Sequence, residues 1–204
     1  MDEYLVPTQF GEGEFVEKKS RFIGRVWPVD TEEEALAKIQ EMKKKHYDAT
    51  HNCWAYILKD GAVRFSDDGE PGGTAGMPIM DTLIRSNTQD ALIVVTRYFG
   101  GILLGSGGLV RAYSRSASDA LNASGSCDMV PASMVGFTID YTRYGSLEGF
   151  VRANSVVKET EFLENVRFSC LVEKEKTDDF IKEIIERTDG RAKPVISGEE
   201  YLRK

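Results

Sequence analysis

The segment TRYFGGILLGSGGLVRAY, residues 96–113, carries a pattern that proteins often use to hold a phosphate. An apolar, strand-like run at 91–95 precedes it, and a helix-like pattern follows it. Free backbone N–H groups at such a helix N-terminus face outward, where the helix dipole favours an anion. We therefore expect a candidate anion site at the N–H groups of residues 106–109, in a loop whose glycines are Gly100, Gly101, Gly105, Gly107 and Gly108.

The two standard nucleotide-binding versions of this loop are both incomplete. A Walker loop needs a lysine after its last glycine, but Gly105 is followed by Ser106 and Gly107. A dinucleotide fingerprint needs a third glycine, and the chain has Val110 at that position. The glycines could equally serve only a tight connection or a close approach of backbones, and both interpretations stay open.

Three arginines flank the loop. Arg97 ends the expected strand, and Arg111 and Arg115 lie one turn apart on the polar face of the helix expected over 108–122. Together with the loop amides they could form a cationic patch suited to RNA phosphate or to an acidic partner. The alternative is ordinary surface pairing, for example of Arg115 with Asp119. The expected anion- or RNA-binding residues are Arg97, Gly105, Ser106, Gly107, Gly108, Arg111 and Arg115.

Acidic residues gather in SDDGEPGG, which holds Asp67, Asp68 and Glu70. They could bind Mg²⁺ or do acid–base work, but Asp, Gly and Pro are also the ordinary residues of a turn. A third interpretation pairs these carboxylates with Arg97, so that they brace the glycine loop.

Metal and nucleophile patterns are weak. His51 and Cys53 form a single local pair with His46 nearby, whereas zinc sites usually show several paired ligands. We interpret them as core residues. No G-x-S-x-G nucleophile elbow occurs. We expect no catalytic residue, no metal site and no cofactor.

Composition limits the remaining classes of function. The chain has 204 residues, 41% of them hydrophobic, and a net charge of −7. Neither half has an excess of basic residues, so nucleic-acid binding would need a local patch. The three cysteines are far apart and indicate reduced thiols. No apolar run has the length of a membrane span and the start lacks a signal-peptide pattern, so we expect a cytoplasmic protein and no membrane partner.

The patterning predicts an α+β protein of two domains, 1–128 and 129–204. The first should hold strands within 13–30, a helix capped by Thr31 with Leu36, Ile39 and Met42 inward, and a hairpin around residues 60–61. A helix near 74–86 and a strand over 91–96 should precede the glycine loop. Residues 123–133 are rich in turn formers and predict a linker. After it, the order is βαββαβ, which is typical of a ferredoxin-like unit, with a helix at 178–188 capped by Thr177 and ended by Gly190.

Four motifs occur in one order: SRFIG (20–24), ATHNCWAY (49–56), SDDGEPGGTAGMPI (66–79) and VVTRYFGGILLGSGGLVRAYS (94–114). Together they resemble the YigZ/IMPACT family over about residues 1–125. The remainder is similar to the small domain of bacterial YigZ/YvyE-type members, through its element order more than its motifs.

The resemblance implies a fold for each domain. The first would have the left-handed βαβ fold of elongation factor G domain IV and of a ribosomal protein. The second would be similar to elongation factor G domain V. The eukaryotic IMPACT protein acts as a translational regulator by binding the scaffold that activates a starvation-responsive kinase, but its N-terminal partner domain is lacking here.

For this chain the resemblance implies a non-enzymatic protein that binds RNA or the ribosome and regulates translation. A second hypothesis is a small-molecule phosphate enzyme that uses the glycine loop with Asp67, Asp68 and Mg²⁺. The loop is similar to that of the GHMP kinases, although its leading proline and second serine are missing. A third hypothesis is a regulatory protein of translation whose partner is another protein.

Overall fold

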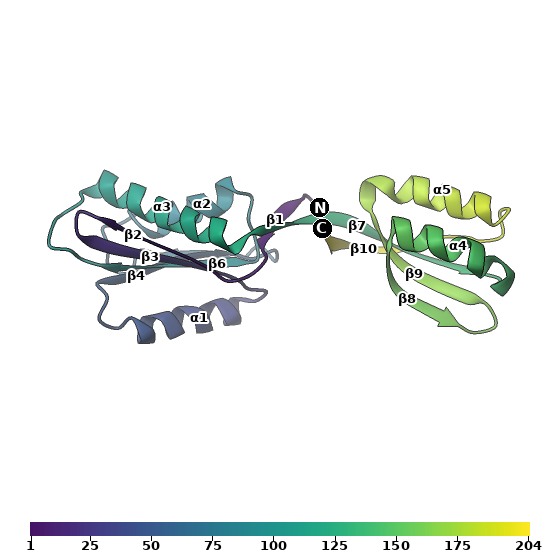
Figure 1. The fold of residues 1–204 in the computed structure, drawn as a ribbon, viewed down its shortest axis with the longest axis horizontal. Helices are drawn as coiled ribbons and strands as arrows, with labels where there is room; N and C mark the ends of the chain where they lie inside the picture. The colour runs from purple at the N-terminus through teal and green to yellow at the C-terminus, as the bar shows by residue number, and fades with distance from the viewer. The chain divides into compact units, whose positions relative to one another are not determined.

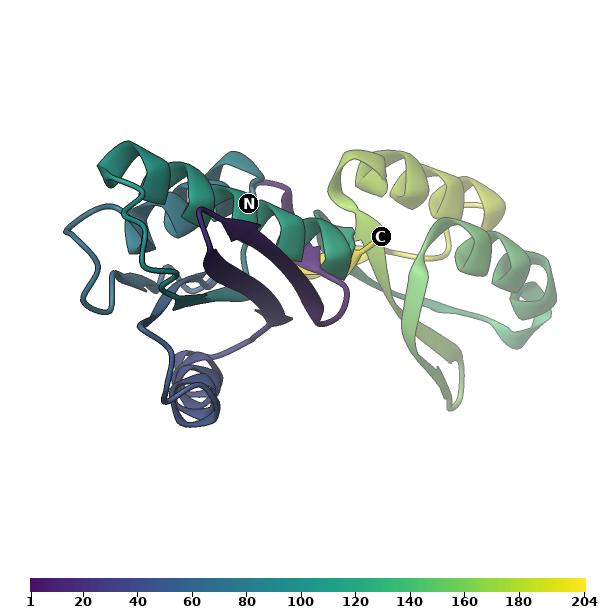
Figure 2. The same cartoon turned by 60° about the vertical axis from the view of Figure 1, so that its left-hand side comes forward.

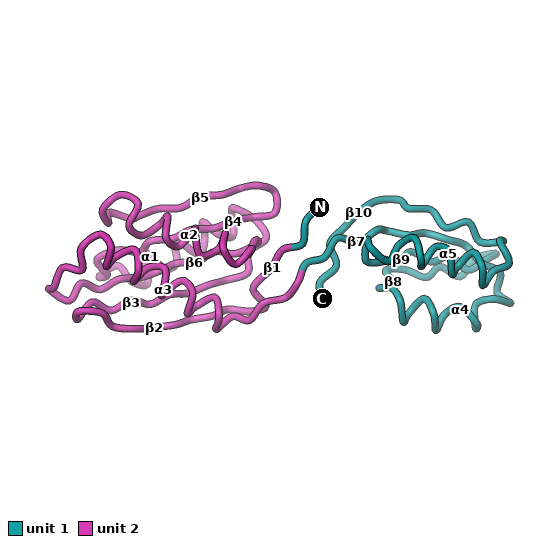
Figure 3. The backbone as a smooth tube through the Cα atoms, turned by 90° about the horizontal axis from the view of Figure 1, so that it is seen from above, with its two compact units in different colours: residues 1–3, 129–204 teal, residues 4–128 magenta.

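The computed structural model describes residues 1–204, which form two compact units. The N-terminal unit is Tyr4–Asp128, and the C-terminal unit is Met129–Lys204 with Met1–Glu3 (Figure 3). Each unit has its own buried core. The chain therefore has the two-domain α+β organisation that its patterning predicts.

A five-stranded sheet in the order β2–β3–β6–β4–β5 is the framework of the N-terminal unit. Every neighbouring pair in it is antiparallel. The short strand β1 (Tyr4–Pro7), which the sequence did not predict, is not part of this sheet, and its Leu5 N–H lies 2.8 Å from the Asn87 carbonyl. The sheet strands are β2 (Gly11–Glu17), β3 (Ser20–Pro28), β4 (His51–Ile57), β5 (Val63–Ser66) and β6 (Ala91–Tyr98).

Helices cover both faces of this sheet, so the central strand β6 is buried almost throughout. Helices α2 (Gly76–Arg85) and α3 (Ser106–Ser124) lie on one face, and α1 (Glu32–Lys45) lies on the other (Figures 1 and 2). The Thr31 side chain accepts from the Glu34 N–H at 3.2 Å, which confirms the predicted cap. Ile39 and Met42 are buried as predicted, whereas Leu36 is 44% exposed and Ala35 takes the inward position beside it.

Helix α3 approaches strand β3 very closely. A Cβ added to Gly24 would lie 2.2 Å from the Ser116 carbonyl oxygen, a separation that no side chain can occupy. The glycine inside SRFIG is therefore a packing requirement, and it lets the middle of α3 pack directly on the sheet.

The C-terminal unit has the ferredoxin-like order βαββαβ. Its strands are arranged β10–β7–β9–β8, all neighbours are antiparallel, and α4 and α5 cover one face (Figures 1 and 2). Phe137, Phe168 and Phe180 lie in the core between helices and sheet. The elements are β7 (Ser126–Ile139), α4 (Tyr141–Asn154), β8 (Val156–Phe162), β9 (Val166–Glu173), a 3₁₀ turn (Lys174–Lys176), α5 (Thr177–Arg187) and β10 (Val195–Arg203).

Two local predictions in this region are wrong. Most of the linker expected over 123–133 belongs to β7, because Met129–Gly136 pairs with β10 and this long-range pairing outweighs the turn preference of the residues. Thr177 does not cap α5 from outside: it is the first helical residue, and its hydroxyl lies 3.0 Å from the Ser133 hydroxyl. The predicted helix end is confirmed, since Gly190 has φ +74° and its N–H bonds to the Ile185 carbonyl.

None of the helices combines the length and the apolar character that crossing a bilayer requires.

Candidate nucleic-acid interface

The glycine loop joins β6 to α3 and exposes the helix N-terminus. Gly105 precedes the helix with φ +76°, a conformation that favours glycine. The Leu109 N–H bonds to the Gly105 carbonyl at 2.9 Å. The prediction that this N–H is open to a ligand is therefore wrong. The N–H groups of Ser106, Gly107 and Gly108 have no acceptor within the chain. Three donors therefore face outward at the positive end of a 19-residue helix.

A strained lysine turn lies beside this loop. Lys18 and Lys19 alone connect β2 to β3, and both have positive φ, at 46° and 66°. Two-residue turns of this kind normally take Asn-Gly, because a side chain crowds the backbone in the left-handed region. Gly100 packs against the turn: a Cβ there would lie 2.0 Å from the Lys19 carbonyl carbon. The absent side chain of Gly100 is what lets the lysine turn sit on the glycine loop.

Side chains from the turn and from α3 meet at one hollow. Lys18, Arg111 and Arg115 line it together with Gly108 and one carboxylate, Glu17, and its volume is about 200 Å³. Neither Lys18 nor Arg111 has an ion-pair partner, whereas Arg115 lies 3.5 Å from Asp119 and stacks over the Phe15 ring at 4.3 Å. We define the basic surface as Lys18, Lys19, Arg111, Arg115 and the N–H groups of residues 106–108.

Arg97 lies apart from the basic surface. Its side chain is buried, and Nη1 donates to Glu70 Oε1 at 2.6 Å. The same carboxylate oxygen accepts from the Tyr113 hydroxyl at 2.7 Å, and the second oxygen lies 3.8 Å from His51 Nε2. Arg97 thus joins the acidic loop, which is the segment that holds Asp67, Asp68 and Glu70, to strand β6, and Tyr113 joins it to helix α3.

The other two carboxylates of the acidic loop hold the loop itself. Asp67 accepts from the N–H groups of Gly73, Ala75 and Gly76 at 2.8–3.0 Å, and so caps the start of α2. Asp68 accepts from the Asn52 N–H at 2.7 Å and from Lys43 Nζ at 2.6 Å. Of the three interpretations of SDDGEPGG, the contacts agree with the one in which a carboxylate pairs with Arg97, and that carboxylate is Glu70. No group of three or more His, Cys, Asp or Glu side chains is placed to hold a metal ion.

His51 and Cys53 share a face of β4, as their spacing predicts, and both point at the acidic loop. His51 Nδ1 lies 2.8 Å from the Asp68 carbonyl oxygen, and the Cys53 thiol donates to the Asp67 carbonyl at 3.0 Å. Burial raises the pKa of the Cys53 thiol, which keeps it protonated. These two side chains therefore help to anchor the loop.

The sequence carries no signal for the contribution of Lys18 and Lys19. A lysine pair between two strands is not a recognised turn sequence, and its neighbour Gly100 is about 80 residues away along the chain. Only the folded structure places the pair beside Arg111.

Comparisons with known proteins cover both units. The Impact N-terminal domain model matches residues 18–121, and a model described as domain of unknown function DUF1949 matches residues 137–191. IMPACT family member YvyE of Bacillus subtilis is 41% identical over 208 residues, which span 100% of this chain and 95% of that protein. IMPACT family member YigZ of Escherichia coli is 41% identical over 125 residues, which span 59% of this chain and 61% of that protein.

More distant similarity extends to eukaryotes and to a solved structure. Protein IMPACT of Rattus norvegicus is 35% identical over 109 residues, or 50% of this chain and 34% of that protein. A crystal structure of a hypothetical protein is 28% identical with a TM-score of 0.62, and the match covers 97% of this chain and 98% of the other. With one family model over the N-terminal unit and a full-length relative of this identity, the chain belongs to the IMPACT family.

Proposed function

We propose that this protein binds structured RNA, free or on the ribosome, through the basic surface of its N-terminal unit, and that it thereby regulates translation in the cytoplasm without catalysis. The observation that carries the proposal is the Lys18–Lys19 turn. Two non-glycine residues in the left-handed region cost of order 1–2 kcal/mol each, and an Asn-Gly pair would avoid most of that cost. A turn that keeps two lysines at this cost supports a role for their charge.

The geometry around the turn suits phosphate groups. Outward N–H donors at a helix N-terminus bind an anion through hydrogen bonds and through the helix dipole. Arg111 on the first turns of α3 and Lys18 across the hollow add two cations that form no ion pair, although the Glu17 carboxylate also lines the hollow. Because the chain as a whole carries a net charge of −7, such a patch would attract RNA locally and not over the whole surface.

The test is a binding titration of a fluorescently labelled RNA hairpin at several salt concentrations. A phosphate interface gives a log K that falls linearly with log salt, with a slope of roughly −0.7 to −0.9 per neutralised phosphate. The variant Lys18→Asn/Lys19→Gly removes two cations while it relieves the turn, so it should bind more weakly, with a slope shallower by about 1–2. Because Asn and Gly adopt positive φ readily, we expect this variant to keep its fold, and the denaturation experiment in the Discussion checks that a binding loss does not come from unfolding.

The matched control is Lys44→Ala/Lys45→Ala, which removes two exposed lysines from α1 on the opposite face of the sheet. It should retain the wild-type affinity and slope. The proposal fails if the wild-type chain binds no hairpin at low salt, or if both double variants lose affinity equally.

A protein partner is the second candidate, and a different observation favours it. Phe99, Ile102 and Leu103 in the glycine loop are all substantially exposed, and Leu103 is 81% exposed. Apolar side chains at a loop are typical of protein interfaces. Capture of partners from a lysate with and without RNase separates the two candidates: a partner retained after RNase, and lost in Leu103→Ser, would support direct protein binding.

A further inference from the structure

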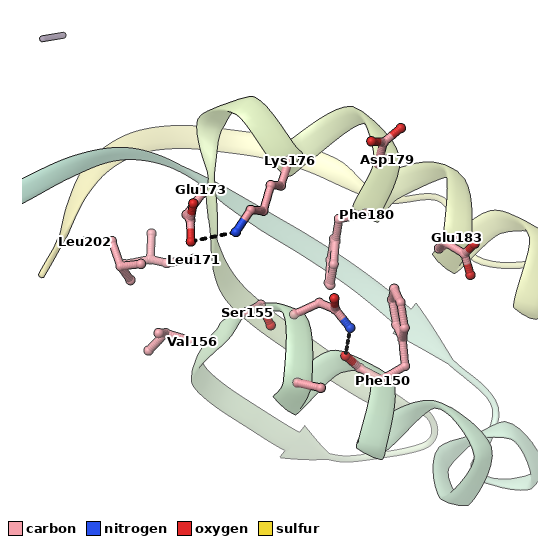
Figure 4. A pocket seen from close by; sticks show the side chains of 12 residues that line it. Phe150, Ser155, Val156, Leu171, Glu173, Lys176, Asp179, Phe180, Glu183 and Leu202 are labelled. Atoms are coloured by element: carbon pink, nitrogen blue, oxygen red, sulfur yellow. Dashed lines mark hydrogen bonds and ion pairs between the residues drawn. The ribbon is translucent and has the colours of Figure 1, made fainter. Parts of the chain in front are cut away.

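The C-terminal unit contains a cavity between α4, α5 and the adjoining ends of β8, β9 and β10, with a volume of about 460 Å³ (Figure 4). This volume lies within the usual range of small-ligand sites. Phe150 on α4 and Phe180 on α5 stack with ring centroids 5.6 Å apart and contribute the aromatic part of the wall. Val156, Leu171 and Leu202 contribute the aliphatic part.

The charged side chains around this cavity are mostly acidic. Glu173, Asp179 and Glu183 line it with one cation, Lys176. Two further cations, Lys204 and Arg187, pair with Glu173 and Glu183 from outside the lining. Glu173 is already neutralised, since Lys176 and Lys204 each donate to it at 3.0 Å. These two lysines hold the pKa of Glu173 below its usual range.

The one lining carboxylate without an ion-pair partner lies on α5. Asp179 has no ion-pair partner, and Glu183 accepts from Arg187 through Oε2 at 2.8 Å, which leaves its Oε1 open. The two residues are four apart in the helix, so they lie on the same face. One turn of α5 therefore presents two open carboxylate acceptors next to an apolar wall.

We propose that this cavity binds a small organic cation, in which a primary ammonium is carried on an aromatic or alkyl body. The body would lie against Phe180 and Leu171, and the ammonium would donate to Asp179 and Glu183. The ammonium has three donors for these acceptors, and its charge is also favoured beside aromatic rings. An anionic ligand of the same shape would face the repulsion of the unpaired Asp179 carboxylate. This site is independent of the basic surface of the N-terminal unit.

The test uses phenethylamine as the probe and the ¹⁵N-labelled full-length chain. Saturable amide shifts should appear at residues that line the cavity, among them Ser155, Lys176 and Phe180. Phenethyl alcohol and 3-phenylpropionate present the same ring with a neutral or an anionic group. The expected order of affinity is amine, then alcohol, then carboxylate, and the preference for the amine should shrink in high salt.

Substitutions then test whether Asp179 is the carboxylate that binds the ammonium. Asp179→Asn should weaken phenethylamine binding about two- to fivefold, as expected for one partly exposed ion pair, and should leave the alcohol unaffected. Asp178→Asn is the matched control, because Asp178 is an exposed neighbour in the same helical turn that does not line the cavity. Ala153→Leu, which fills the cavity from an exposed position on α4, should weaken all three probes.

Equal affinity for the three probes, amide shifts outside the cavity, or equal effects of Asp178→Asn and Asp179→Asn would each overturn the proposal.

Discussion

Arg97 Nη1 lies 2.6 Å from Glu70 Oε1 inside the N-terminal unit, and both side chains are more than nine-tenths buried. The Tyr113 hydroxyl donates to the same oxygen, and the Arg97 guanidinium lies 5.5 Å from the centre of the Phe22 ring. This ion pair ties the acidic loop to strand β6 just before the glycine loop begins. One of the three arginines that flank the glycine loop in sequence therefore supports the loop from within and is absent from the surface.

Removal of the Glu70 charge should strongly destabilise the N-terminal unit. Glu70→Gln keeps the size of the side chain but leaves the buried guanidinium of Arg97 without a counter-charge, which we expect to cost about 3–5 kcal/mol of unfolding free energy. Urea denaturation measures this loss. Glu41→Gln on the exposed face of α1 is the control and should cost less than about 1 kcal/mol. If Glu70→Gln were as mild as the control, the ion pair would have no structural role.

The lysine turn predicts an inverse relation between stability and function. Lys18→Asn/Lys19→Gly should raise the unfolding free energy by about 1–3 kcal/mol, because Asn and Gly adopt positive φ more readily. The same denaturation experiment measures this gain. The control Lys44→Ala/Lys45→Ala should change stability little. An unchanged or lowered stability in the turn variant would show that the turn stores no strain.

Glycines of the N-terminal unit should differ in their tolerance of alanine. Gly24→Ala forces a Cβ toward the Ser116 carbonyl oxygen and should cost roughly 2 kcal/mol or more, since a backbone atom cannot move aside easily. Gly107→Ala meets only the end of the Arg111 side chain, at 3.6 Å, and should be neutral or stabilise by up to about 1 kcal/mol. Thermal denaturation of the two variants compares them directly, and a reversed order would contradict the packing of α3 on β3.

His46 should make stability depend on pH. Burial, with a smaller effect of Arg25, lowers the pKa of this imidazole, and its Nε2 is buried without a hydrogen-bond partner. The unfolded state therefore binds a proton more readily than the folded state, so stability should fall as the pH drops through the ordinary histidine pKa of about 6.5. His46→Asn should reduce this slope. Unfolding free energies of both proteins at pH 7.5 and 5.5 give the comparison, and parallel profiles would exclude the effect.

The three thiols should differ in how fast a thiol reagent modifies them. Cys53 and Cys170 are fully buried and burial raises the pKa of both, whereas Cys127 is partly exposed. A thiol reagent such as DTNB should modify Cys127 rapidly in the native protein and the other two only after denaturation. Cys127→Ser should abolish the rapid phase. Fast native modification of more than one thiol would contradict the burial of Cys53 or Cys170.

Much of the fold follows from local patterns. The capping box at Thr31, the turn at Asp60–Gly61 and the glycine after α5 each act within a few residues, and the structure contains all three elements. The prediction over 123–133 was wrong because its outcome depends on β10, whose pairing residues begin at Val195. For α1 the prediction was right at Ile39 and Met42 and wrong at Leu36, because Ala35 and Leu36 are both compatible with the periodicity and only Ala35 packs against the sheet.

The sequence by itself determined the family, the order of most strands and helices, and the glycine loop that opens α3. The tertiary structure decided which charges are free. In the folded chain Glu70 pairs with Arg97, which is 27 residues away in the sequence. Asp67 and Asp68 accept hydrogen bonds from backbone N–H groups around their own loop, and the lysine turn packs against Gly100. The physical reason is that periodicity and capping are local energies, whereas burial and charge pairing depend on groups that meet only when the sheet has formed.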